Sequence, residues 1–134
     1  MQEHAEILFV NEAFYFAFQM KDIEAMEDIW ARHAPVACTH PGWPCLSGRD
    51  QVMQSWSAIF ANPDAQTVTC RGATARRYGE AAFVTCYEVI GDSLLAATNF
   101  LVREAGAWKM VHHQAGPCHA PPSDLAEEEE ASLQ

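Results

Sequence analysis

The chain has 134 residues, 49% of them hydrophobic, and a formal net charge of -10 at pH 7. This length is enough for one hydrophobic core and short for two, so we expect a single domain. The 8 basic residues are too few for the clustered positive surface that phosphate backbones require, which argues against a nucleic-acid partner.

Apolar runs and cysteines bound the cellular setting. No apolar run is long enough to span a bilayer, because Glu12 and Gln19 interrupt the first hydrophobic segment and later runs are shorter. We therefore expect no membrane partner. The 5 cysteines are an odd number, and the first residues lack the basic region and apolar run of a secretory signal. These observations favour reduced thiols and a cytoplasmic protein.

Helical periodicity dominates the first part of the chain. Apolar residues recur at helical spacing from His4 to Met20, which predicts a first helix buried on more than one side. Asp22 can cap a second helix with Trp30 on its apolar face. That helix ends near Pro35, because the residue before a proline disfavours helix. Residues 36–40 then alternate as a short strand does.

A shaped loop, a third helix and a series of strands follow. Residues 41–48 contain two prolines and two glycines, which predicts a fixed loop that presents His40 and Trp43. The third helix has Trp56 on its apolar face. The period then changes to alternation, and we expect an antiparallel meander of strands at residues 66–71, 74–78, 81–90, 94–103 and 107–114.

This order of elements is an α+β layout. We expect the domain to span residues 1–116. Residues 117–134 combine prolines with a run of glutamates and few apolar residues, so we expect an acidic, poorly ordered tail.

The sequence resembles a SnoaL-like member of the NTF2-like superfamily, which also contains ketosteroid isomerase and scytalone dehydratase. The similarity covers about residues 6–115 and rests on the motifs at residues 14–18 and 21–26, 38–43 with 48–49, and 108–114. It implies a cystatin-like cone, in which three N-terminal helices pack on a curved antiparallel sheet around a pocket. It also implies a homodimer through the outer face of the sheet. The superfamily holds isomerases, dehydratases and cyclases beside binding and assembly modules, so the fold leaves the activity open.

His40 and Trp43 are the candidates in the loop. A histidine at the end of a strand that faces a cavity can transfer protons near neutral pH, and the alternative is that it bonds backbone and fixes the loop. Trp43 can stack on a flat ligand or pack as a hydrophobic plug.

Glu88 and Asn99 interrupt apolar strands. If the strand is regular, Glu88 shares a face with Val84 and Cys86, where a lone carboxylate would have a raised pKa suited to acid or base catalysis. The alternative is a surface or dimer-interface position paired with an arginine. Asn99 can polarise a ligand carbonyl or satisfy a neighbouring strand.

His112 and His113 are adjacent on the last strand, so regular alternation sends them to opposite faces. Trp108 and Met110 share a face with His112 in that pattern. We therefore expect His112 to line the interior and His113 to serve the dimer face.

Five cysteine and histidine residues suggest a zinc site, but their spacing does not match known zinc motifs, and we expect no metal. They are Cys38, His40, Cys45, Cys118 and His119.

The sequence thus predicts an apolar pocket for a small organic molecule. If the protein is an enzyme, we expect proton transfer next to a carbonyl without a cofactor, with Glu88 or His40 as base and His112 as acid or oxyanion donor. The alternatives are a non-catalytic ligand-binding or dimerisation module, and a structural dimer with a closed core. The residues expected to contact the ligand are Trp30, Trp43, Trp56 and Asn99.

Overall fold

The structure is a computed structural model and describes residues 2–120. From residue 121 onward, the segment expected to be a tail lies outside the described residues. The helices are α1 (Gln2–Met20), α2 (Ile23–Ile29) and α3 (Arg49–Ala61). The strands are β1 (Ala37–Thr39), β2 (Leu46–Ser47), β3 (Thr69–Tyr78), β4 (Ala81–Ile90), β5 (Ser93–Glu104) and β6 (Ala107–Pro117). None of the described helices is both long and apolar enough to cross a membrane.

The six strands form one sheet in the order β2-β1-β6-β5-β4-β3. The meander from β3 to β6 is antiparallel, as expected. The two strands expected at residues 66–71 and 74–78 form the single strand β3, with an irregularity in register between Arg71 and Thr74. The expectation of an entirely antiparallel sheet is wrong, because β1 pairs with β6 in parallel. After β1 and β2 the chain forms α3 and then adds β3 at the opposite edge of the sheet. The meander runs back from there, so that its last strand, β6, pairs with β1. The sheet is therefore mixed.

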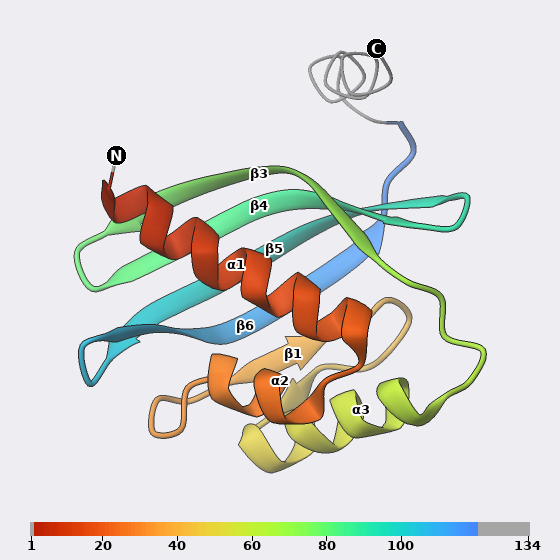
Figure 1. The fold of residues 1–134 in the computed structure, drawn as a ribbon, viewed down its shortest axis with the longest axis horizontal. Coiled ribbons are helices and arrows are strands. Elements are labelled where there is room, and N and C mark those ends of the chain that lie inside the picture. Colours follow the sequence, from red (N-terminus) through yellow and green to blue (C-terminus); the bar gives the residue numbers. More distant parts are fainter. Residues whose placement is uncertain (1, 121–134) are drawn as a thin grey trace.

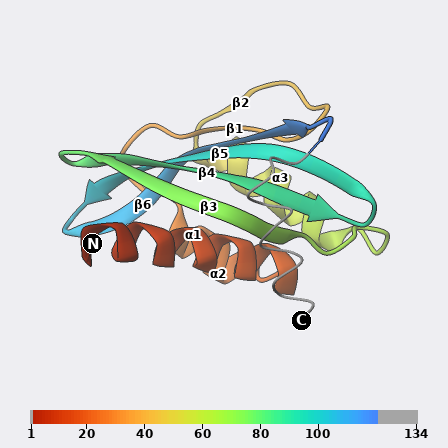
Figure 2. The ribbon, with the colours of Figure 1, turned by 90° about the horizontal axis from the view of Figure 1, so that it is seen from above.

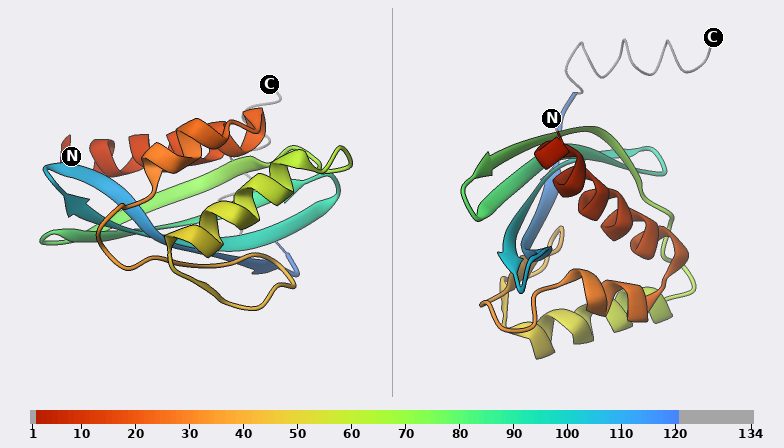
Figure 3. Two further views of the ribbon diagram at one scale, coloured as in Figure 1. Left: turned by 90° about the horizontal axis from the view of Figure 1, so that it is seen from below. Right: turned by 60° about the vertical axis from the view of Figure 1, so that its left-hand side comes forward.

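All three helices lie on the same face of the curved sheet (Figures 1 and 2). In the right-hand view of Figure 3 the sheet bends around that helical layer, in which α1 lies above α2 and α3. The main core lies between these layers and is built around Phe14, Trp30, Trp56 and Met110. A smaller core that includes Ile7 and Trp108 lies under the first part of α1. This architecture is the α+β cone that the sequence predicts.

Two charged side chains hold the segment between α2 and β1. The Glu104 carboxylate accepts the backbone N–H groups of Arg32, His33 and Ala34 at 2.8, 3.0 and 2.9 Å. These bonds lower the pKa of Glu104 to about 2. The Arg49 guanidinium donates to backbone carbonyls at the end of α2, among them Trp30 O at 2.9 Å. This segment leads directly into β1 and so positions His40.

Candidate functional site

Five buried polar side chains meet inside the cone, and we call them the inner polar cluster. They come from α1, β4, β5 and β6, which converge over the middle of the sheet. Each is at most 5% exposed, so water does not satisfy their polar atoms. The members are Asn11, Tyr15, Glu88, Asn99 and His113.

Hydrogen bonds join all five members. The Tyr15 hydroxyl donates to Glu88 Oε2 at 2.7 Å. The Asn99 amide donates from Nδ2 to Asn11 Oδ1 at 2.8 Å and to Tyr15 Oη at 3.2 Å. Asn99 Oδ1 is thus left as an acceptor, and His113 Nδ1 donates to it at 2.6 Å. The proton of a neutral His113 therefore lies on Nδ1, and its Nε2 carries a free lone pair.

That lone pair faces the carboxyl group. His113 Nε2 lies 3.7 Å from Glu88 Oε2, just beyond hydrogen-bond distance. Burial raises the pKa of Glu88, and the hydrogen bond from Tyr15 partly opposes this. Burial, followed by the charges of the neighbouring His40 and His112, lowers the pKa of His113 to about 3. Both shifts favour an uncharged pair in which the Glu88 proton and the basic nitrogen of His113 lie side by side.

His40 forms a second group next to this cluster. Its Nε2 lies 2.8 Å from Ser55 Oγ, whose own proton goes to Val52 O at 2.6 Å, so Nε2 is the donor. The His40 and His113 rings lie 6.3 Å apart, and the ring of Trp56 lies 4.7 Å from His40 and 5.9 Å from His113. Burial lowers the pKa of His40 to about 4, so this imidazole is also neutral near pH 7.

The expectation that His112 faces the interior is wrong, because β6 contains a β-bulge. Phe100 pairs with His112 and Leu101 with Met110, which leaves Val111 as an extra residue. The bulge resets the alternation, so that His113 and not His112 follows Met110 onto the inner face. His113 is 1% exposed, whereas His112 lies on the outer face beside Phe100 and bonds Ala37 O through Nδ1.

The three tryptophans expected at the ligand occupy different positions. Trp30 and Trp56 are fully buried in the main core, and Trp43 is 42% exposed. The Trp43 ring packs edge-on against His40 at 5.0 Å. Glu88 and Asn99 belong to the inner polar cluster, so the structure brings together two of the predicted residues with His40 nearby and separates them from His112.

Two surface hollows lie on either side of these buried groups. One, of about 220 Å³, lies between α1 and β3 and is lined by Tyr15 and Cys70 together with Glu12, Phe16 and Gln19. The other, of about 260 Å³, lies over Ser55 beside Trp43. Tyr15 and Ser55 therefore separate these hollows from Glu88 and His40.

The cluster offers acid and base chemistry in a dry setting. Within the described residues, no group of three or more His, Cys, Asp or Glu side chains is arranged to hold a metal ion. The cluster instead holds a carboxyl group, an imidazole lone pair, a phenol and two amides, which are groups that transfer protons or hold a polar ligand.

Three members of the inner polar cluster were not predicted from the sequence to lie at the site. Asn11 and Tyr15 lie four residues apart on one face of α1. A lone asparagine among the apolar residues of a buried helix was the available signal, because a buried amide requires partners. His113 carried no local signal, since the bulge at Val111 depends on pairing with β5.

Comparison with known proteins gives the family. The SnoaL-like domain family matches residues 7–118. Over 111 residues the chain is 27% identical to the F-box protein SKIP8 of Arabidopsis thaliana, covering 81% of this chain and 48% of that protein. The chain thus spans about half the length of this curated relative.

Two solved structures are each 31% identical to this chain. A candidate dehydratase of the NTF2-like family from Streptomyces avermitilis has a TM-score of 0.80, over 89% of this chain and 98% of that one. A candidate calcium/calmodulin-dependent protein kinase type II association domain from Thiobacillus denitrificans has a TM-score of 0.70, over 82% and 93%. Together with the family match, these structures show that the chain belongs to the SnoaL-like domain family of the NTF2-like superfamily.

Proposed function

We propose that the protein is a cofactor-independent enzyme that transfers a proton on a small organic molecule, as an isomerase, cyclase or dehydratase does. The observation that carries this proposal is the Glu88 and His113 pair, 3.7 Å apart in a buried network. Apolar side chains of similar volume usually stabilise a protein core as well as a buried polar network does, or better. A chemical role explains why the chain keeps one here.

The groups divide into roles by their chemistry. Glu88, with its raised pKa, exchanges the proton with the carbon or oxygen of the substrate. His113 Nε2 first receives the proton of Glu88, which leaves a carboxylate that can remove a proton from the substrate. The protonated His113 then serves as the acid, the role expected of His112. Tyr15 and Asn99 are donors suited to a developing oxyanion. The substrate reaches Glu88 from the hollow at Tyr15, once the Tyr15 hydroxyl exchanges its bond to Glu88 for one to the substrate oxygen.

The charges around that hollow favour an uncharged substrate. Glu12 is the charged residue that lines it, and the whole chain has a formal charge of -10. Repulsion disfavours anionic substrates at such a rim. All five cysteines are free thiols, which supports a reducing compartment such as the cytoplasm.

The Glu88→Gln variant tests the enzyme proposal. Glutamine keeps an oxygen that accepts the Tyr15 bond but cannot exchange a proton. We expect the wild type to accelerate α-proton exchange in D2O on some members of a panel of small ketones and β-hydroxy ketones, followed by NMR. In the variant this rate should fall by about 100-fold or more.

Glu24→Gln is the matched control, because Glu24 is exposed on α2 and distant from the cluster. It should leave the exchange rate unchanged. Equal rates for wild type and Glu88→Gln, or no acceleration on any member of the panel, would contradict the enzyme proposal and favour a non-catalytic module.

A second candidate function is homo-oligomerisation through the outer face of the sheet. An aromatic row crosses β4, β5 and β6 there, with Phe83 5.5 Å from Phe100 and Phe100 6.0 Å from His112. Phe100 is 42% exposed and the neighbouring Tyr78 is 67% exposed. A contiguous exposed aromatic surface is a common docking site, and a second copy covers it symmetrically. The similarity to an association domain supports this choice of partner.

Phe100→Glu tests this interface. A charge at the centre of an apolar contact should convert the oligomer to a monomer at micromolar concentration, measured by light scattering after size-exclusion chromatography. Phe16→Glu, at a residue 64% exposed on α1, is the control and should keep the wild-type mass. A wild type that is already monomeric would overturn this candidate.

A further inference from the structure

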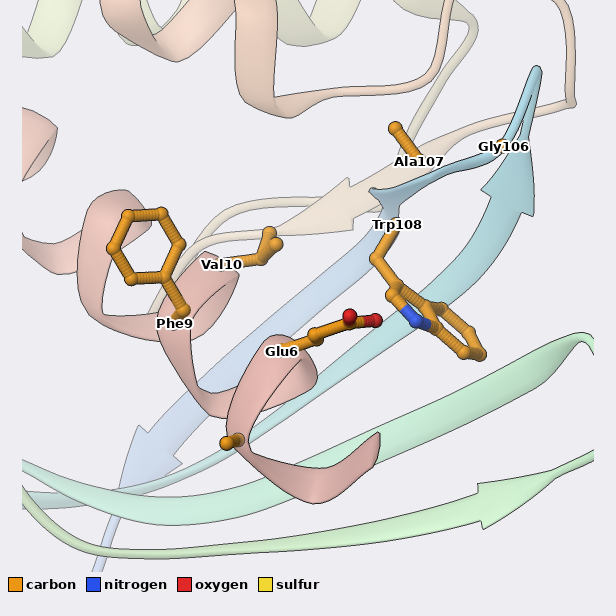
Figure 4. Close-up of a pocket in the computed structure, with 7 residues that line it drawn as sticks. Glu6, Phe9, Val10, Gly106, Ala107 and Trp108 are labelled. Carbon is orange, nitrogen blue, oxygen red and sulfur yellow. The ribbon is translucent and has the colours of Figure 1, made fainter. Parts of the chain in front are cut away.

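A third hollow, of about 510 Å³, lies where the first part of α1 crosses the start of β6. Its lining shares no residue with the inner polar cluster. The hollow is formed on one side by Glu6, Phe9 and Val10 and on the other by Trp108 and the preceding turn (Figure 4). It is a separate site, with no role in the function proposed above.

Trp108 brings an unused donor to this hollow. The residue is 6% exposed, and its Nε1 is buried without a hydrogen-bond acceptor among the described residues. Leaving such a donor without a hydrogen bond destabilises the fold, unless a bound molecule supplies the acceptor. The indole nitrogens of Trp30 and Trp56 are also unpartnered, but those residues are fully buried in the core and line no described hollow. Of these three tryptophans, Trp108 is the one that lines a described hollow.

The ring of Trp108 is held in place by its neighbours. The Arg77 and Arg103 guanidinium groups lie 5.2 and 5.9 Å from its centre, and Arg103 Nη2 also donates to Gly106 O at 3.4 Å. Cation–π contacts favour a fixed ring, so the direction of the N–H group is set before a ligand binds.

Glu6 supplies the complementary acceptor. Figure 4 shows its carboxylate and the nitrogen edge of Trp108 turned toward each other across the hollow. No hydrogen bond joins the two groups in the structure, so both remain available to a ligand. Phe9, which is 70% exposed, and Val10 add an apolar wall. Such a site suits an apolar body carrying one neutral group that both accepts and donates.

We propose that this hollow binds small neutral aromatic alcohols. The ligand hydroxyl accepts from Trp108 Nε1 and donates to the Glu6 carboxylate, while its ring packs against Phe9 and Val10. An aromatic hydrocarbon is disfavoured because it leaves the indole N–H unpaired.

The test is a titration of ¹⁵N-labelled protein with p-cresol, followed by the indole N–H signals in ¹H–¹⁵N NMR spectra. The Trp108 signal is identified by its proximity to the Val10 methyl groups. We expect it to shift saturably while the Trp30 and Trp56 signals stay in place. Toluene, which lacks only the hydroxyl, should bind more weakly by about tenfold or more.

Two variants complete the experiment. Phe9→Ala changes an exposed side chain, so the variant should fold normally and bind p-cresol more weakly by about threefold or more. Met20→Ala, also at an exposed residue of α1, is the control and should bind as the wild type does. Equal affinity for toluene and p-cresol, an unmoved Trp108 signal, concerted shifts of all indole signals, or an unaffected Phe9→Ala variant would each overturn the proposal.

Discussion

Between pH 6.5 and pH 4.5, the Glu88→Gln variant is expected to lose about 4 kcal/mol of unfolding free energy, which is more than the wild type loses. The reason is that three buried groups of the site titrate in opposite directions. His40 and His113 have folded-state pKa values of about 4 and about 3, below their value of 6.5 when unfolded. Glu88 has a folded-state pKa above its unfolded value of 4.5.

The sign follows from the protons bound in each state. Below pH 6.5 the unfolded chain increasingly protonates both histidines, while the folded protein leaves them largely neutral. Each histidine therefore costs stability as the pH falls, by up to about 1.36 kcal/mol per unit. Glu88 acts in the other direction, because the folded protein holds a proton that the unfolded chain has lost. The wild type therefore loses less unfolding free energy than the variant, because the variant lacks the compensating carboxyl group.

Urea unfolding at pH 6.5, 5.5 and 4.5 measures the difference. Glu24→Gln again serves as the control and should follow the wild-type curve. Parallel curves for wild type and Glu88→Gln would mean that Glu88 is ionised in the folded protein, which would contradict the uncharged pair described above.

Trp56→Ala is expected to lower the unfolding free energy by about 3–5 kcal/mol, because it leaves a large cavity in the main core. Trp56 is fully buried, and its ring packs edge-on against Phe14, Phe18 and His40 with centres 5.4, 5.0 and 4.7 Å apart. Few side chains of this core contact so many aromatic neighbours.

Trp43→Ala provides the comparison for this prediction. Trp43 is 42% exposed and its ring packs against His40, so its removal should cost about 1 kcal/mol or less. Thermal and urea unfolding of both variants measure the two losses. Similar losses for the two substitutions would show that Trp56 does not anchor the core.

The sequence was sufficient for the fold class because the relevant patterns are local. Helical spacing identified α1, α2 and α3, and alternation with turn signals identified the meander of β3 to β6. The parallel pairing of β1 with β6 could not be read in this way. It joins Ala37 to His112, and no local pattern encodes a contact between residues so far apart.

The sequence placed residues of the inner polar cluster on the inner face only where the apolar neighbours of a regular strand decide which face is buried. Glu88 and Asn99 lie inside, because their apolar neighbours fix the inner face of regular strands. For Glu88 this is the inner of the two positions that the sequence left open. The choice between His112 and His113 depended on one extra residue, Val111, and a shift of one residue sends every later side chain to the other face. Tyr15 was hidden because an aromatic residue on a buried helix reads as ordinary core.

The position of β1 in the sheet also constrains the order in which the protein can assemble during synthesis. Ala37 of β1 pairs with His112 of β6, so this pairing cannot form until almost the whole domain has left the ribosome. Asn11 and Tyr15 of α1 likewise wait for Asn99 and Glu88. During this interval the apolar face of α1 is without its sheet. The nascent chain therefore depends on protection from chaperones or on rapid closure of the β3 to β6 meander, whose pairings are local.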